Sequence, residues 1–366
     1  MVRQLNFHKI YYYIIVAILA SLSLLNTCTN SNGGSLNAIL EETVFILAFF
    51  NFFITGIKKN KIIFVVLIFM ILLITKFNSF FIVPVLFSLA FVNYTPWDLI
   101  RGYNLANLFS LCMTVLLSIL GFLPMRNYLD GVISLGYTNE NTLGLFTLLI
   151  SLFYTLEIIM YKSKMKFIRL KIIFIITFVF LNYFIIEDRT VIVVFLVFLL
   201  LCYVFKSKIN FFVYLTKVLG CLCPILFTYI SLFLVKHYDS SNFYFTLNKL
   251  LTNRLYMWNW YFERMPISLY PSNLKINLFD FWGTIDGSYV YLLFQSGVLV
   301  TIITCSLLVY SNYLLLKNNF NYLFCLLLSL EVCAFSEDIL QLPLIVFVMC
   351  FALLSIYPNW VTKFNE

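Results

Sequence analysis

The chain has 366 residues, of which 62% are hydrophobic and 11% are charged. Soluble proteins carry roughly 25% charged residues, so this composition excludes a soluble globular enzyme and predicts an all-α, polytopic transmembrane helical bundle. The net charge of +8 is typical of loops that face anionic lipid, so we expect membrane lipid and no nucleic acid as a partner.

Apolar segments long enough to cross a bilayer recur along the chain, and they predict about 12 spans. We expect them to form a single integral membrane domain over residues 1–366. The predicted spans are 10–25, 36–57, 62–75, 79–94, 105–124, 142–161, 172–186, 190–205, 214–235, 289–313, 320–335 and 339–357. The first is interpreted as an uncleaved anchor, because Thr27-Cys28-Thr29 is a poor cleavage site.

Charged residues divide between the two sides of this layout when the N-terminus is placed in the cytoplasm. The inner loops then hold half of the basic residues, which are Lys58, Lys59, Lys61, Lys162, Lys164, Lys166, Arg169, Lys171, Lys206, Lys208, Lys317 and Lys363. The outer loops hold Glu41, Glu42, Asp130, Glu140, Glu187, Asp188, Glu337 and Asp338. The positive-inside rule therefore predicts that both termini are cytoplasmic.

The longest interruption of the apolar pattern, residues 236–288, is predicted to be an extracytoplasmic loop within this domain. It contains an expected short amphipathic helix from Lys249 to Glu263, which ends before Pro266. Apolar and polar side chains recur on it at helical spacing. One face carries Leu251, Leu255, Trp258 and Phe262, and another carries Arg254 and Tyr261.

Two interpretations of this loop helix remain open. It is either an interfacial helix with aromatic anchors, or a lid over an outer cavity. In the second case Trp258 and Tyr261 would stack on sugar rings. Arg254 and Arg264 would then face a diphosphate, since a guanidinium matches phosphate oxygens.

Two further outer motifs precede the long loop. In the segment from Gly136 to Gly144, one of Thr138, Asn139 and Asn141 can cap the next helix, and Glu140 suits its positive end. The alternative is that Asn139 and Asn141 bind a sugar or phosphate at this helix N-terminus.

The turn Glu187-Asp188-Arg189-Thr190 is either a solvated hairpin or an arginine that two acids orient toward an anion.

Two motifs follow the loop helix. Asp286-Gly287-Ser288-Tyr289 stands at the entrance to the tenth span. Glu331 and the pair Glu337-Asp338 are carboxylates within or beside an apolar segment, where such groups are candidates for function. A carboxylate is also the general base that a glycosyl transfer needs.

Some motifs are missing from the sequence. His8 and His237 are the only histidines, and neither an Asp-x-Asp pair nor a phosphate-binding Gly-Lys-Ser/Thr loop occurs. The cysteines lie mostly in apolar segments, so we expect packing rather than a disulfide framework. We therefore expect no cofactor and no metal.

Four motifs resemble those of a known family, and they occur in the same order along the chain. They are Gly136–Gly144, Asp188-Arg189-Thr190, Asn253–Trp258 and Asp286–Tyr289, with Gly297 beyond the last. This family is that of the bacterial O-antigen and capsular polysaccharide repeat-unit polymerases, which are related to the O-antigen ligases. The resemblance implies a glycosyltransferase of the bacterial cytoplasmic membrane that works in surface polysaccharide biosynthesis.

The resemblance also implies the reaction. A glycan on undecaprenyl diphosphate at the outer leaflet is the donor, a lipid-linked oligosaccharide repeat unit is the acceptor, and undecaprenyl diphosphate is released. The flippase and the chain-length regulator of the same pathway would be partners. The catalytic candidates are Arg189 and Arg254 for the diphosphate, with Arg264 in reserve. Glu337 and Glu140 are the first candidates for the base, followed by Asp188 or Asp338. The substrate-binding candidates are Asn139, Asn141, Asp188, Arg264, Trp258, Tyr261, Asp286 and Tyr289.

Two alternatives stay open. A flippase or transporter usually shows two related halves, which this sequence does not. An O-antigen-type ligase usually has a histidine in its late outer loop, and His237 at the start of that loop keeps this function possible.

Overall fold

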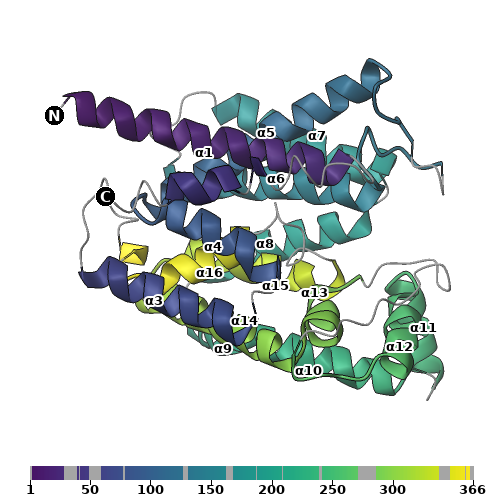
Figure 1. Ribbon diagram of the computed structural model, residues 1–366. Coiled ribbons are helices and arrows are strands. Elements are labelled where there is room, and N and C mark those ends of the chain that lie inside the picture. Colours follow the sequence, from purple (N-terminus) through teal and green to yellow (C-terminus); the bar gives the residue numbers. More distant parts are fainter. Residues whose placement is uncertain are drawn as a thin grey trace. The chain divides into compact units, whose positions relative to one another are not determined.

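The computed structural model describes residues 2–28, 39–40, 42–48, 59–76, 79–126, 131–161, 168–186, 188–207, 209–238, 241–270, 286–337, 347–358 and 360–362. Within these ranges the regular structure is helical (Figure 1), and strand pairing is limited to an isolated bridge between Arg126 and Ile133. The all-α class predicted from composition is therefore confirmed for the described part of the chain.

The chain divides into two compact units. Unit 1 comprises residues 1–57, 86–200 and 359–366, and unit 2 comprises residues 58–85 and 201–358. Two helices run from one unit into the other, namely α4 (Ser79–Phe91) and α8 (Arg189–Ser207).

Unit 1 is built from successive helices that pack on one another. They are α1 (Val2–Cys28), α5 (Pro96–Ile119), α6 (Glu140–Tyr161) and α7 (Ile168–Leu181), which continues into a π-helical turn (Asn182–Ile186). Helix α5 contacts both α1 and α6, and α6 contacts α7 (Figure 1). The side chain of Asn182 joins the last pair, because its Nδ2 donates to Thr147 Oγ1 at 2.6 Å.

Helix α5 begins well before residue 105, where the sequence-based span began. Thr95 and Asp98 form a capping box, in which each side chain accepts a hydrogen bond from the other residue's backbone N–H, and Pro96 occupies the first turn. These groups satisfy the N–H donors that a helix start leaves open, so the helix extends beyond the apolar segment.

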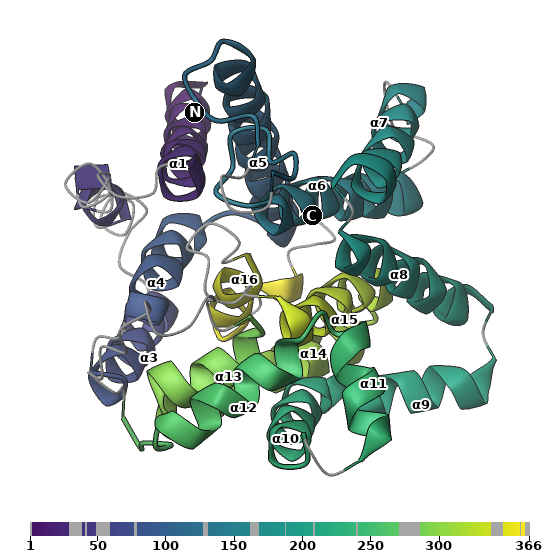
Figure 2. The ribbon, with the colours of Figure 1, turned by 90° about the vertical axis from the view of Figure 1, so that its right-hand side faces the viewer.

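Unit 2 contains the remaining helices. They are α3 (Lys59–Ile74), α9 (Asn210–Cys221), α10 (Cys223–Lys236), α11 (Asn242–Leu250), α12 (Arg254–Arg264), α13 (Ser288–Tyr291) with a π-helical turn (Leu292–Ser296), α14 (Val298–Lys317), α15 (Asn321–Ser336) and α16 (Phe347–Ser355). Helix α14 contacts α15 and α16, while α10 contacts α12, α13 and α15. Figure 2 gives a second view of these helices.

Helices that suit a bilayer occur in both units. Among the described residues, four are long and apolar enough to cross a membrane: Pro96–Ile119, Glu140–Met160, Arg189–Ser207 and Val298–Lys317. The bent pair α9 and α10 raises this number to five if it counts as one span. These helices indicate a membrane protein, as the composition predicts. Most of the predicted span 36–57 and the first half of 339–357 lie outside the described residues.

Two predicted spans are interrupted in unit 2. Segment 214–235 forms α9 and α10, which meet at Leu222 with a bend of 67°, and Pro224 stands in the first turn of α10 because it cannot continue α9. Segment 289–313 is broken at Gly297, whose φ is 86°. A Cβ at Gly297 would lie 2.7 Å from the carbonyl of Tyr270, so the close approach of that backbone requires glycine.

The predicted helix from Lys249 to Glu263 is wrong at its start. Helix α11 ends at Leu250, and Thr252 and Asn253 have φ values of 52° and 63°. The side chain of Asn248 holds this left-handed turn, because its Nδ2 donates to Asn253 Oδ1 at 3.2 Å and its Oδ1 accepts from Tyr256 N at 3.0 Å. Helix α12 therefore begins at Arg254. Its end before Pro266 agrees with the prediction.

Candidate functional site

Three charged residues from separate parts of the sequence meet in unit 2, and we call Arg254, Asp286 and Glu337 the Arg254 cluster. Arg254 opens α12, Asp286 directly precedes the turn into α13, and Glu337 ends α15. Each therefore stands at a helix boundary. The local backbone at these boundaries, rather than a single helix face, determines where each side chain points.

The guanidinium of Arg254 contacts both carboxylates. Its Nη2 lies 2.6 Å from Glu337 Oε1, and its Nε lies 3.5 Å from Asp286 Oδ2. The side chains of Arg254 and Glu337 are 8% and 3% exposed, whereas that of Asp286 is 24% exposed. Removing water from ions is costly unless they are paired, so the short contact keeps both buried ions in place.

The backbone of the Asp286-Gly287-Ser288 turn is held between α12 and α15. Ser288 donates from its N and its Oγ to the carbonyl of Glu337, at 3.1 and 2.7 Å. Trp258 Nε1 donates to the carbonyl of Asp286. Gly287 has φ of 97°, and a Cβ there would lie 2.8 Å from Trp258 Cζ2. Only glycine fits both this conformation and this contact.

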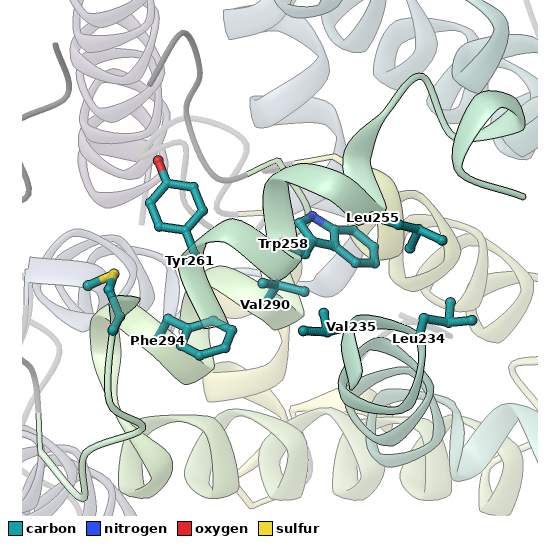
Figure 3. Packing of buried hydrophobic residues seen from close by; sticks show 8 residues of the cluster. Leu234, Val235, Leu255, Trp258, Tyr261, Val290 and Phe294 are labelled. Atoms are coloured by element: carbon teal, nitrogen blue, oxygen red, sulfur yellow. The ribbon is translucent and has the colours of Figure 1, made fainter. Parts of the chain in front are cut away.

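Trp258 and Tyr261 support the cluster from the hydrophobic core. Figure 3 shows Trp258 packed with Val235 and Val290, beside Leu255, while the hydroxyl of Tyr261 points away from these side chains. The two rings are 0% and 1% exposed. Stacking on sugars belongs to one of the two interpretations of the loop helix, and in this structure both rings pack in the core that supports α12.

The other expected binding residues of unit 2 lie apart from the Arg254 cluster. Tyr289 is 1% exposed, and its hydroxyl donates to the carbonyl of Glu331 at 3.4 Å. Arg264 is at the far end of α12, where it lies 3.6 Å from Glu263 and 4.3 Å from the ring centre of Trp260. Ten residues of helix separate Arg254 from Arg264, which corresponds to about 15 Å, so Arg264 does not join the cluster.

In unit 1, Asn139 is the cap of α6, as one of the sequence interpretations proposed. Its Oδ1 accepts from Thr142 N at 2.8 Å and from Thr142 Oγ1 at 2.7 Å. Glu140 occupies the first turn of α6, where a negative charge is favourable, and Asn141 is half-buried beside it. The side-chain oxygen of Asn139 is thus engaged in capping α6.

The Gly136–Gly144 motif meets the turn at Asp188. Asp188 is 6% exposed and its Oδ1 caps α8, with Thr190 N at 2.9 Å and Val191 N at 3.4 Å. A Cβ at Gly144 would lie 3.0 Å from Asp188 Cγ, so glycine at this position makes room for the carboxylate. Arg189 follows at the start of α8 and is exposed. Glu187 and Asp338 lie outside the described residues.

A π-helical turn stands next to the acidic motif in each unit. Residues 182–186 precede Asp188, and residues 292–296 follow Tyr289. Such turns insert an extra residue into a helix and often occur at functional sites. Sequence periodicity missed both turns, because a helix with one inserted residue keeps its apolar composition.

Sequence reasoning missed Asn248, and it named Gly287 and Ser288 within a motif without predicting the backbone contacts that they make. Gly287 carried a usable signal, since glycine between Asp286 and Ser288 at a helix entrance suggests a special backbone conformation. Among the described residues, no group of three His, Cys, Asp or Glu side chains could hold a metal ion. The Arg254 cluster places a guanidinium between two carboxylates.

No protein-family model, curated protein or solved structure matches this chain.

Proposed function

We propose that this chain polymerises undecaprenyl-diphosphate-linked oligosaccharide repeat units at the outer face of a bacterial cytoplasmic membrane. The observation that carries the proposal is the Arg254 cluster. It unites Arg254, Asp286 and Glu337 from three segments that the charge pattern assigns to one side of the membrane. Two of these segments belong to the motifs that resemble the polymerase family.

Contacts within unit 1 support the proposed topology of 12 spans with both termini in the cytoplasm. Trp360 Nε1 donates to the carbonyl of Tyr94 at 2.9 Å, and Lys171 pairs with Glu157. Each pair joins segments that this topology assigns to the inner side. The contact between Asp188 and the position of Gly144 joins two outer segments. An inverted span between them would separate these partners.

Contacts within unit 2 support the same layout. Phe64 and Tyr357, both assigned to the inner side, have ring centres 5.4 Å apart. Lys76, assigned to the outer side, lies 3.8 Å from the ring centre of Tyr270 in the long loop. The ion pair of Arg254 and Glu337 joins the long loop to the last outer turn.

The proposed reaction is a glycosyl transfer without metal or nucleotide. The acceptor hydroxyl gives its proton to the carboxylate of Glu337, and its oxygen forms a bond to the anomeric carbon of the donor glycan. The bond from that carbon to the diphosphate oxygen breaks, and undecaprenyl diphosphate leaves with the electron pair. Charge that develops on the leaving group is stabilised by guanidinium groups.

The geometry refines the proposed role of each arginine. Two carboxylates share Arg254, so its main task is to hold Glu337 in position. A diphosphate oxygen would replace Asp286 at Nε, where the contact of 3.5 Å is the longer one. Arg189 in unit 1 is exposed and stands beside Asp188, and it remains the other arginine that the sequence proposes for binding an anion.

Deletion of the gene followed by gel analysis of surface glycan tests the proposal. A polymerase mutant retains glycan with a single repeat unit, because transfer of one unit to its final acceptor does not need polymerisation. Loss of all surface glycan would instead indicate a flippase or a ligase, the two alternatives from the sequence.

A further inference from the structure

Glu331 is a buried carboxyl group within the apolar helix α15 of unit 2, and it lies outside the Arg254 cluster. It is 0% exposed. Its side-chain partner is Asn312 of α14, whose Nδ2 lies 3.0 Å from Oε1 and 3.1 Å from Oε2. None of the ion pairs among the described residues includes Glu331. One amide group is therefore the donor to an acid in an apolar helix.

Asn312 also connects Glu331 to the bend between α9 and α10. Its Nδ2 lies 3.3 Å from the carbonyl oxygen of Gly220, which stands two residues before the break at Leu222. A Cβ at Gly220 would lie 2.6 Å from Phe324 Cζ, so glycine lets α9 approach α15 closely. Two carboxyl oxygens and one backbone carbonyl oxygen thus surround Nδ2 of Asn312.

The side-chain oxygen of Asn312, Oδ1, is also buried. Asn312 is 0% exposed, and its Oδ1 has no hydrogen-bond partner among the described residues. The oxygen and nitrogen of an amide are assigned from hydrogen bonding, and either orientation leaves more acceptors than donors at this site. A proton on the carboxyl group would supply a further donor, whereas a bound cation would satisfy the oxygens by coordination.

In the part of the chain that the structure describes, the other titratable groups around Glu331 carry no positive charge. They are the hydroxyl of Tyr289 on α13 and the thiols of Cys221, Cys223 and Cys305 on α9, α10 and α14. Each is neutral or, when ionised, negative. An unpaired carboxylate in such surroundings costs far more free energy than a protonated carboxyl.

We propose that Glu331 and Asn312 form a proton-binding site at the break between α9 and α10. Glu331 carries the proton in the resting protein, Asn312 donates to its carbonyl oxygen, and the carbonyl of Gly220 completes the polar surroundings. Broken helices provide proton and cation sites in membrane proteins because their backbone carbonyls are open to a ligand. The site is separate from the proposed polymerase chemistry, since Glu331 precedes Glu337 by about 9 Å along α15.

Infrared difference spectroscopy of the full chain in lipid nanodiscs at neutral pH tests the proposal. A protonated carboxyl has a carbonyl-stretch band that carboxylates lack, and the band shifts in D2O. The spectrum of the wild type minus that of Glu331→Gln should contain this band. Glu337→Gln is the matched control, and it should remove carboxylate bands only, because Glu337 is paired with Arg254.

Two results would overturn the proposal. In the first, Glu331→Gln removes only carboxylate bands, so that Glu331 is ionised. In the second, the band is present in choline chloride and is lost when sodium chloride replaces it. The oxygens of Glu331 would then bind an alkali cation instead of a proton.

If Glu331→Gln fails to fold, Asn312→Leu provides the test, because loss of the amide donor raises the frequency of a protonated carboxyl. An unchanged spectrum in that region would also contradict the site. These readouts do not involve glycan, so they stand or fall independently of the polymerase assay.

Discussion

The guanidinium of Arg254 and the carboxylate of Glu337 lie 2.6 Å apart, although 83 positions separate them in the sequence. Both side chains are nearly inaccessible to water. Removal of one partner from a buried ion pair leaves the other charge uncompensated, so the pair makes each residue sensitive to loss of the other.

Arg254→Ala should therefore lower the free energy of unfolding by about 3–5 kcal/mol and leave single-repeat glycan in place of polymer. Arg264→Ala is the matched control on the same helix. Its side chain is 49% exposed, so the change in stability should stay within about 0.5 kcal/mol. Thermal unfolding of the purified variants and a glycan gel from the same strains provide the measurements. Long chains of normal distribution from Arg254→Ala would remove Arg254 from the site.

Glu337→Gln separates the chemistry from the packing. The substitution keeps the shape of the side chain and its hydrogen-bond acceptor, but it removes the proposed base. General-base catalysis contributes about 10²–10⁴-fold, so polymerisation of a lipid-linked repeat unit should slow by that factor in a purified assay. Asp286→Asn, at the more exposed partner, should slow it less. Equal rates for Glu337→Gln and the wild type would transfer the role of base to another carboxylate.

Gly287→Ala should disrupt the turn that carries Asp286. The new methyl group would lie 2.8 Å from Trp258 Cζ2 and would occupy a residue with φ of 97°. Gly121→Ala is the control, because Gly121 has φ of 81° and no atom within 4 Å of a Cβ there. The control should lose about 1 kcal/mol through backbone strain alone, and it should keep polymer. Similar melting temperatures for the two variants would show that Trp258 yields to the methyl group.

Gly144 and Asp188 should behave as a coupled pair in unit 1. Asp188→Ala removes the cap of α8 and should lower stability by about 0.5–2 kcal/mol. Gly144→Ala should displace the Asp188 carboxylate, since a Cβ would lie 3.0 Å from its Cγ. Because both changes disturb the same cap, the double variant should lose less stability than the sum of the two single variants. Additive losses in thermal unfolding would mean that the cap survives Gly144→Ala.

The long loop should react with reagents that cannot cross the membrane. Ile267 follows α12 and is 41% exposed, so Ile267→Cys should be modified by an impermeant maleimide in intact cells. Lys206→Cys, at the end of α8 that the proposed topology places in the cytoplasm, should be protected until the cells are opened. Native cysteines are first replaced where they react. The opposite pattern of protection would invert the proposed topology.

Periodicity and composition predicted several local features, and the structure explains why they succeed. Asn139 caps α6 and α12 ends before Pro266, because capping and proline geometry depend on neighbouring residues only. The start of α12 was mispredicted for a different reason. The turn at Thr252 and Asn253 is held by the side chain of Asn248, and this contact outweighs helical spacing.

The helical, apolar character of the chain and the residue types at its helix ends were predictable from the sequence, because they follow from composition and from contacts within a few residues. The meeting of Arg254, Asp286 and Glu337 was not predictable in this way. Neither were the burial of Trp258 and Tyr261 and the contact of Glu331 with Asn312. The way helices pack and bend determines which residues far apart in the sequence come into contact. Helical spacing reports only on neighbours within one helix, so it does not predict these contacts.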